Sequence, residues 1–130
     1  MTLKFSQDQR KQYLLMTDRI GSGWLHLFGD NTEFYSAAYW DLLTGIWRVS
    51  GPVRKTDALK MMQAIKSAHT AGKYIDTALR NGFLIEQDNS EDARSKLLTL
   101  SPDMRQKMDV FFDEAVEGVL ETARKIDENA

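Results

Sequence analysis

The chain contains no cysteine, which excludes disulfide bonds, a thiolate nucleophile and zinc sites built on cysteine. It has only two histidines, His26 and His69, and they lie far apart in the sequence. No apolar run approaches the ~20 residues that a bilayer-spanning helix needs, so we expect no membrane partner. The first residues lack the apolar core of a signal peptide, and a cytoplasmic location is therefore expected.

Sequence motifs of catalysis are also missing. The chain has no Ser-His-Asp order, no glycine-rich phosphate loop and no His-x-x-x-His metal pair. Its carboxylates are most frequent near the C-terminus, in a pattern typical of the solvated face of a helix. We therefore expect no enzymatic activity, no cofactor and no metal site.

Positive charge is scarce overall but unevenly distributed. The formal net charge is −2, yet residues 48–107 contain 11 Lys and Arg against 7 Asp and Glu, a balance of +4. A surface that faces phosphates needs a local positive field, and the rest of the protein need not be basic. Because charge also fluctuates along any sequence, this segment agrees with nucleic-acid binding but does not require it.

The N-terminal part of the chain is expected to be helical. Ser6 and Gln9 form a capping-box pattern, and an apolar stripe follows as far as about Phe28. After a turn signal, Thr32 can cap a second, heavily apolar helix over residues 33–49.

Two further helices are expected. One starts at Thr56 and covers residues 56–66. The other is the final helix, since Ser101 can cap it, Pro102 suits its first position and apolar residues recur at three- and four-residue spacing for about twenty-five residues.

Between these two helices lies the most informative stretch. Ser67 can cap a compact helix, and Gly82 stands where that helix should stop. Two aliphatic runs, residues 83–87 and 96–100, flank a polar loop over residues 88–95, which indicates a hairpin. A helix that leads directly into a hairpin is the winged-helix arrangement.

The long terminal helices predict a homodimer. An apolar stripe on each needs more partner surface than one copy of so small a domain supplies. We expect the interface to use Leu14, Phe111 and Val119. The alternative is that the two helices cover each other within one monomer.

Three short motifs carry a family resemblance. The helix that starts at Ser67 ends in a glycine followed closely by an aliphatic residue (Gly82–Leu84), and the wing carries an Asp-x-Arg motif (Asp92–Arg94). The second wing strand runs into a Leu-Thr pair, Leu98–Thr99 or, shifted, Leu100–Ser101. In this order and spacing, the chain resembles the multiple antibiotic resistance regulator (MarR) family of winged-helix transcription factors over nearly its whole length.

The resemblance implies a mainly α fold with a small β-hairpin wing in a single domain. Residues 32–100 would form the winged helix-turn-helix core, and residues 6–31 and 101–128 the dimerisation helices. It further implies a transcriptional regulator that binds duplex DNA as a homodimer, with recognition helix 67–81 in the major groove and wing 88–95 at the minor groove.

The residues expected to contact DNA come from the recognition helix, its flanks and the wing: Lys66, Ser67, His69, Thr70, Lys73, Thr77, Arg94 and Lys96. Asp92 would fix the wing tip rather than contact DNA. The same side chains could instead form an ordinary solvated face. Gly72 and Ala68 leave the recognition helix with few base-reading side chains, so a winged-helix protein-interaction module without sequence-specific DNA binding is the alternative function.

Aromatic residues suggest an effector site. In the family, small aromatic or anionic ligands often bind between the dimerisation helices and the core, and Trp24, Tyr35, Tyr39 and Trp47 supply aromatic surface for such a ligand. Aromatic side chains at helical spacing are more often part of a plain hydrophobic core, and the sequence leaves both interpretations open.

Overall fold

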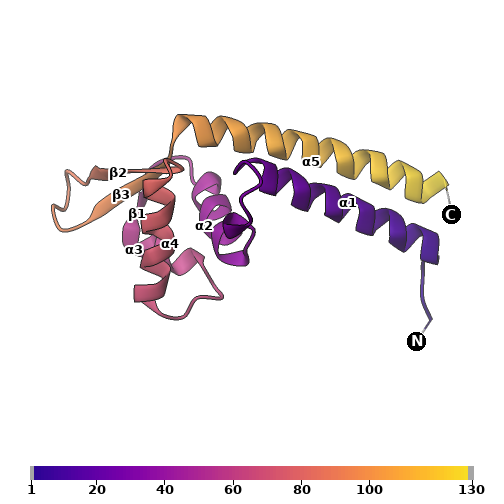
Figure 1. Ribbon diagram of the computed structural model, residues 1–130, viewed down its shortest axis with the longest axis horizontal. Coiled ribbons are helices and arrows are strands. Elements are labelled where there is room, and N and C mark those ends of the chain that lie inside the picture. Colours follow the sequence, from indigo (N-terminus) through magenta and orange to yellow (C-terminus); the bar gives the residue numbers. More distant parts are fainter. Residues whose placement is uncertain (1, 129–130) are drawn as a thin grey trace. The chain divides into compact units, whose positions relative to one another are not determined.

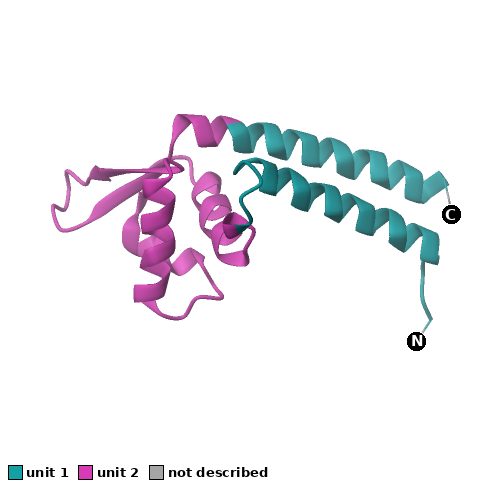
Figure 2. Ribbon diagram, in the orientation of Figure 1, with its two compact units in different colours: residues 1–32, 107–130 teal, residues 33–106 magenta. Residues whose placement is uncertain are grey.

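The computed structural model describes residues 2–128 (Figure 1). The chain divides into two compact units (Figure 2): unit 1 comprises residues 1–32 and 107–130, and unit 2 comprises residues 33–106. Among the described residues, none of the helices combines the length and the apolarity that crossing a bilayer requires.

Unit 1 consists of α1 (Gln7–His26) and most of α5 (Pro102–Glu128), which lie side by side and antiparallel. At one end, the side-chain amide of Gln9 donates a hydrogen bond of 3.0 Å to the carbonyl oxygen of Ile126. At the other end, the Trp24 ring packs edge-on against Phe111, with ring centroids 5.7 Å apart. The predicted cap of α1 is confirmed, because Ser6 and the third helical residue exchange both capping-box hydrogen bonds.

Phe111 corrects one expectation about the dimer interface. Its side chain is 5% exposed, since it packs against Trp24 and lies 3.3 Å from where a Cβ on Gly23 would stand. Phe111 therefore belongs to the core of unit 1 and has little surface to offer a second copy. The stripe on α5 divides, with Phe111 turned inward and Val119 exposed.

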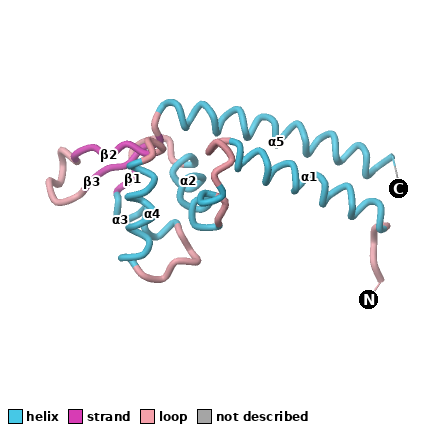
Figure 3. Tube along the Cα trace, in the orientation of Figure 1, coloured by secondary structure: helices cyan, strands magenta, loops and turns pink. Residues whose placement is uncertain are grey.

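Unit 2 combines short helices with a small sheet (Figure 3). Its first element is a 3₁₀ turn at the boundary between the units, η1 (Thr32–Phe34). The other elements follow in chain order: α2 (Ala37–Arg48), β1 (Val53–Arg54), α3 (Lys55–Met61), α4 (Ala68–Arg80), β2 (Leu84–Asp88) and β3 (Lys96–Leu100). The antiparallel sheet has the order β1-β3-β2, with Val53 opposite Leu98 and Leu84 opposite Leu100. The expected fold class, mainly α with a small β-hairpin wing, is confirmed.

The core of unit 2 is formed by side chains from its helices and from its sheet. Those buried to 1% exposure or less include Leu42, Leu43, Ile46, Met62, Ile75 and Leu98. Full burial of one such aliphatic side chain stabilises a fold by roughly 1.5–3 kcal/mol. The core therefore fixes α2 and α4 against β3.

Two predicted boundaries in unit 2 are wrong. The second helix is capped by Ser36 rather than Thr32, because the chain first makes a 3₁₀ turn that buries Phe34 against Tyr39 and Phe83. The third helix ends at Met61, five residues early, since the next residue leaves helical geometry at ψ 82° with its side chain buried. In both places tertiary packing overrides local helix propensity.

The predicted boundaries of α4 and α5 hold. The Ser67 hydroxyl accepts a hydrogen bond from the backbone N–H of Thr70 at 3.3 Å, and Gly82 adopts φ +76° directly after the helix end. Ser101 accepts from the N–H of Met104 at 3.1 Å, and Pro102 occupies the first position of α5.

We predict that Ser101→Ala destabilises the chain by about 1 kcal/mol, because it leaves a buried N–H at the start of α5 without its acceptor. Urea unfolding monitored by circular dichroism measures this change. Ser22→Ala, at an exposed position within α1, is the control and should stay within about 0.5 kcal/mol of wild type. Equal stability of the two variants would show that the cap contributes nothing.

Candidate nucleic-acid interface

The rotation of α4 about its own axis is set by one buried face. Ala71, Ile75 and Ala78 are each 1% exposed or less, while Lys73 is exposed on the other side of the helix. Because two of these three side chains are only methyl groups, the helix backbone can pack close to the core. The side chains on the outer face are therefore held in a defined direction.

Tyr39 of α2 adds a second fixed point for α4. Its ring packs edge-on against Tyr74 at a centroid distance of 5.0 Å, and its hydroxyl hydrogen-bonds the Thr77 side chain. The guanidinium of Arg80 donates to the Thr77 hydroxyl at 3.0 Å. Burial raises the pKa of Tyr39 above its ordinary value of 10.0, and the hydrogen bond from Thr77 acts in the opposite direction.

Most of the residues expected to contact DNA lie on α4 or directly before it, and their environments differ. Lys66, His69, Thr70 and Lys73 are exposed at the start and on the outer face of α4. Neither lysine has a carboxylate within 4 Å among residues 2–128, so both charges are available to an anion. Thr77 differs, because it is half-buried and its hydroxyl is engaged by Tyr39 and Arg80.

Asp76 is a residue of this surface that the sequence analysis missed. It is exposed on α4, three residues after Lys73 and four before Arg80, with no cation within 4 Å in the described part of the chain. The helical spacing alone was enough to place it there. A carboxylate here repels phosphate and can accept a hydrogen bond from a base amino group, as acidic residues do at cytosine N4.

The wing tip is a loop over residues 89–95 with hydrogen bonds of its own. The Asp92 carboxylate accepts from the backbone N–H of Arg94 at 3.1 Å and lies 3.7 Å from its guanidinium. Asn89 accepts from the N–H of Glu91 at 3.0 Å in the same manner. These bonds hold the backbone while the Arg94 side chain, 94% exposed, extends into solvent.

The base of the wing is neutralised by ion pairs. Lys96 pairs with Asp88 opposite it in the hairpin; the hydrogen bond and the charge of Lys96 lower the pKa of Asp88, and those of Asp88 raise the pKa of Lys96. The Lys55 ammonium group lies 3.2 Å from the carboxylate of Glu86, which is on β2 together with Asp88. Lys96 is therefore less available to a phosphate than Lys66 or Lys73.

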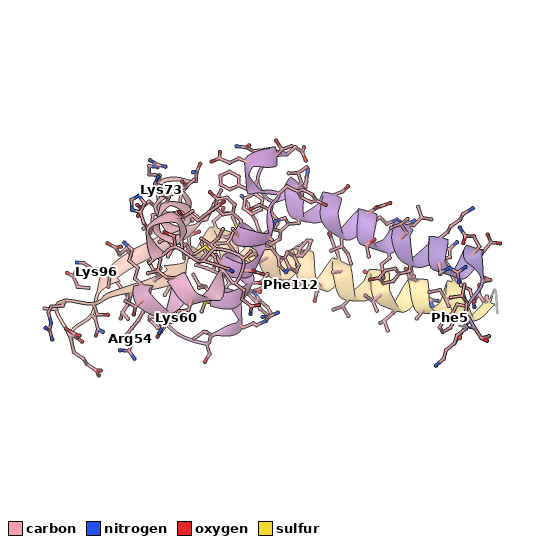
Figure 4. The ribbon with its side chains drawn as sticks, turned by 90° about the horizontal axis from the view of Figure 1, so that it is seen from below. Phe5, Arg54, Lys60, Lys73, Lys96 and Phe112 are labelled. Carbon is pink, nitrogen blue, oxygen red and sulfur yellow. The ribbon has the colours of Figure 1, made fainter. Side chains whose placement is uncertain are left out.

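The cations of unit 2 do not share one side. Figure 4 shows Lys73 projecting from one side of the unit, and Arg54 and Lys60 from the other. Arg54 is moreover within 3.6 Å of the Asp57 carboxylate. A nucleic acid on the outer face of α4 would meet Lys73 without meeting Lys60.

The four aromatic residues expected at an effector site lie in different environments. Trp24 is buried in unit 1, whereas in unit 2 Trp47 is half-buried, Tyr35 is exposed and Tyr39 is 3% exposed. The edge of Tyr39 reaches a shallow hollow of about 270 Å³ whose other lining residues all belong to α4: Thr70, Lys73, Tyr74 and Thr77. Within residues 2–128 no group of three or more His, Asp or Glu is placed to hold a metal ion.

We predict that Tyr39 makes stability depend on alkaline pH. Because its folded-state pKa is raised, the folded chain keeps the phenol proton longer than the unfolded chain, and stability falls as pH rises through about 10. Urea unfolding at about pH 8 and about pH 10.5 should show a larger loss for wild type than for Tyr39→Phe. Tyr35→Phe, at an exposed site, should retain the wild-type pH dependence. An unchanged pH dependence in Tyr39→Phe would contradict this assignment.

Comparison with known proteins gives a likeness of fold without a likeness of sequence. A scan against protein-family models gave no match, and neither did a search of curated proteins. Solved structures do match. One is AbsC, a MarR family transcriptional regulator from Streptomyces coelicolor, with a TM-score of 0.57 and 15% identity over 93% of this chain and 82% of that one.

Two other matching structures are of proteins that bind DNA. A mutant of MepR from S. aureus, bound to an oligodeoxyribonucleotide, has a TM-score of 0.64 and 14% identity over 97% of this chain and 94% of that one. BpsR of Bordetella bronchiseptica, whose DNA binding is regulated by 6-hydroxynicotinic acid, has a TM-score of 0.53 and 21% identity over 94% of this chain and 84% of that one. The chain thus has the winged-helix fold of MarR-type transcriptional regulators.

Proposed function

We propose that the chain is a transcriptional regulator that binds duplex DNA through α4 and the wing. The observation that carries this proposal is the outer face of α4, where Lys66 and Lys73 are exposed and have no carboxylate within 4 Å among residues 2–128, on or directly before a helix whose rotation is fixed by its buried face. The MarR-type fold supports it, because a structure of that fold was solved with an oligodeoxyribonucleotide. Phosphate contacts would supply affinity, and base edges specificity.

In this proposal α4 enters the major groove and the wing reaches the minor groove. Lys73 can bind a guanine edge or a phosphate, and Thr70 can contact a thymine methyl or a phosphate. Arg94 at the wing tip would lie in the minor groove, where the concentrated negative potential attracts a guanidinium. Asp92 would hold the tip, as its hydrogen bond to the backbone of Arg94 suggests.

We propose further that two copies bind together. Large apolar side chains are exposed on both helices of unit 1: Leu14, Leu15, Val110, Val116, Val119 and Leu120. Covering these would remove apolar surface from water and stabilise a dimer. Two-fold symmetry would then present two α4 helices to half-sites about one helical turn apart.

An aromatic anion is the effector class that the hollow beside α4 favours. Tyr39 and Tyr74 offer aromatic edges, and Lys73 offers a positive charge at the rim. A ligand there would cover part of the surface proposed for DNA. Trp24, Tyr35 and Trp47, also expected at the effector site, do not line this hollow.

The alternative function is a winged-helix module that binds protein and not DNA. It is favoured by the small side chains of α4 and by Asp76, which opposes phosphate. Anisotropy titration of labelled DNA from the chain's own upstream region, at two salt concentrations, separates the two. Absence of binding at low salt, where phosphate contacts are strongest, would leave the protein module as the better account.

We predict distinct effects for two cations. Arg94→Ala should weaken binding to most DNA sequences by a similar factor and lower the salt slope by about one counterion, with little change in thermal stability. Lys73→Ala should also change the preference between sequences, because Lys73 can reach base edges. Anisotropy titrations against several duplexes measure both effects.

Lys60→Ala is the matched control for this pair, since it removes one exposed lysine charge from the other side of unit 2. It should leave affinity close to that of wild type. If Lys60→Ala weakens binding as much as Lys73→Ala, the duplex does not lie along α4.

A charge in the proposed interface should separate the two copies. Val119 is 46% exposed on α5, and Val119→Asp would place a carboxylate in an apolar contact, which costs several kcal/mol unless the charge is paired. Sedimentation at micromolar concentration should show monomers, and DNA affinity should fall more than tenfold (about 1.4 kcal/mol). The isosteric Val119→Thr is the control and should remain largely dimeric. A wild-type chain that sediments as a monomer would refute the dimer.

A further inference from the structure

Gly72 lies in the interior of α4, where glycine is costly. Relative to alanine, a glycine inside a helix destabilises it, because the flexible backbone loses more entropy on folding. The position is the fifth residue of Ala68–Arg80, so neither a helix cap nor a turn explains it.

Three other glycines of the chain have a reason within the fold, whereas Gly118, inside α5, also has open space where a Cβ would stand. A Cβ on Gly45 would stand 2.7 Å from the sulfur of Met61, so this glycine lets α2 and α3 approach closely. A Cβ on Gly23 would stand 3.3 Å from the Phe111 ring, and Gly82 has a positive φ. At Gly72 the backbone is not in the left-handed region, and a Cβ would meet nothing within 4 Å. The fold leaves this position free for a side chain.

The neighbours of Gly72 show which surface lacks the side chain. On a helix, residues three and four positions away share a face with a given position; for Gly72 the exposed ones are Ala68, His69 and Asp76, while Ile75 is buried. Gly72, itself half-buried, therefore forms a notch at the edge of the outer face of α4, with His69 and Asp76 on one side and the buried Ile75 on the other.

We propose that Gly72 is the point where the DNA duplex comes closest to α4. This inference rests on the proposed function, in which the outer face of α4 enters the major groove. Without a Cβ, the helix backbone can touch a base edge directly, and its Cα–H can contact a base oxygen.

Close approach at Gly72 compensates for the short side chains around it. Ala68 offers only a methyl group, and the His69 side chain meets base edges only if the helix lies deep in the groove. Gly72 is thus a positioning residue: it sets the depth at which His69 and Lys73 act, and so influences which sequences are preferred.

The test is a graded series, Gly72→Ala and Gly72→Leu, with two measurements on the full chain. Urea unfolding should show that Gly72→Ala is more stable than wild type, because the added methyl meets open space and limits the unfolded chain. Anisotropy titration on wild-type target duplex should show about tenfold weaker binding for Gly72→Ala, as expected when one methyl overpacks a close contact. Gly72→Leu should bind more weakly still and alter the ranking of duplexes.

Gly51→Ala is the matched control. It adds the same methyl in open space, in the loop between α2 and β1 and outside α4, so DNA affinity should not change. Sedimentation of each variant shows whether its oligomeric state is that of wild type.

Two results would overturn the inference, and they differ from failure of the proposed function. If wild type binds DNA and both Gly72 variants bind it equally well, α4 is not closest to DNA at Gly72, although the chain is still a DNA-binding protein. If Gly72→Ala is less stable than wild type, the fold itself requires this glycine. If wild type binds no DNA even at low salt, the proposed function fails and the inference fails with it, a result that the wild-type titration alone shows.

Discussion

The surface that unit 2 presents depends on how α4 is fixed to the core. Ala71, Ile75 and Ala78 are fully buried. Tyr39 contacts a second side of the helix, the one that carries Tyr74 and Thr77. A turn of α4 by one residue would move each outer side chain by about 100° around the axis. The apolar contact on one side and the hydrogen-bonded contact on the other thus determine what a partner can meet.

The parts of the fold that depend on local chemistry could be predicted from the sequence. Ser6, Ser67 and Ser101 cap helices as expected, because a capping hydroxyl needs only backbone N–H groups two or three residues away. The hairpin was also predictable, since its polar loop separates two aliphatic runs. The two-residue strand β1 was not, because it is too short to show any alternation and exists only through its pairing with β3.

The parts that depend on distant contacts could not be predicted. Thr32 and Ser36 are both good caps, and only the burial of Phe34 in the core decides between them. Thr77 seemed a free hydroxyl on a helix face until the structure placed Tyr39 beside it. Phe111 and Val119 belong to one apolar stripe, and only packing in unit 1 shows which of them is covered.

The wing tip also has a consequence for the thermodynamics of association. Its backbone is tied by local hydrogen bonds, from the N–H of Arg94 to Asp92, from Glu91 to Asn89 and from Ser95 to the carbonyl of Asp92. A loop that is already ordered loses little conformational entropy when a partner arrives, so more of its contact energy appears as affinity. The entropic loss left at the tip is that of its exposed side chains, among them the long side chain of Arg94. The short side chains of Asp92 and Asn89 thus order the backbone that carries Arg94, and they leave its charge only partly neutralised.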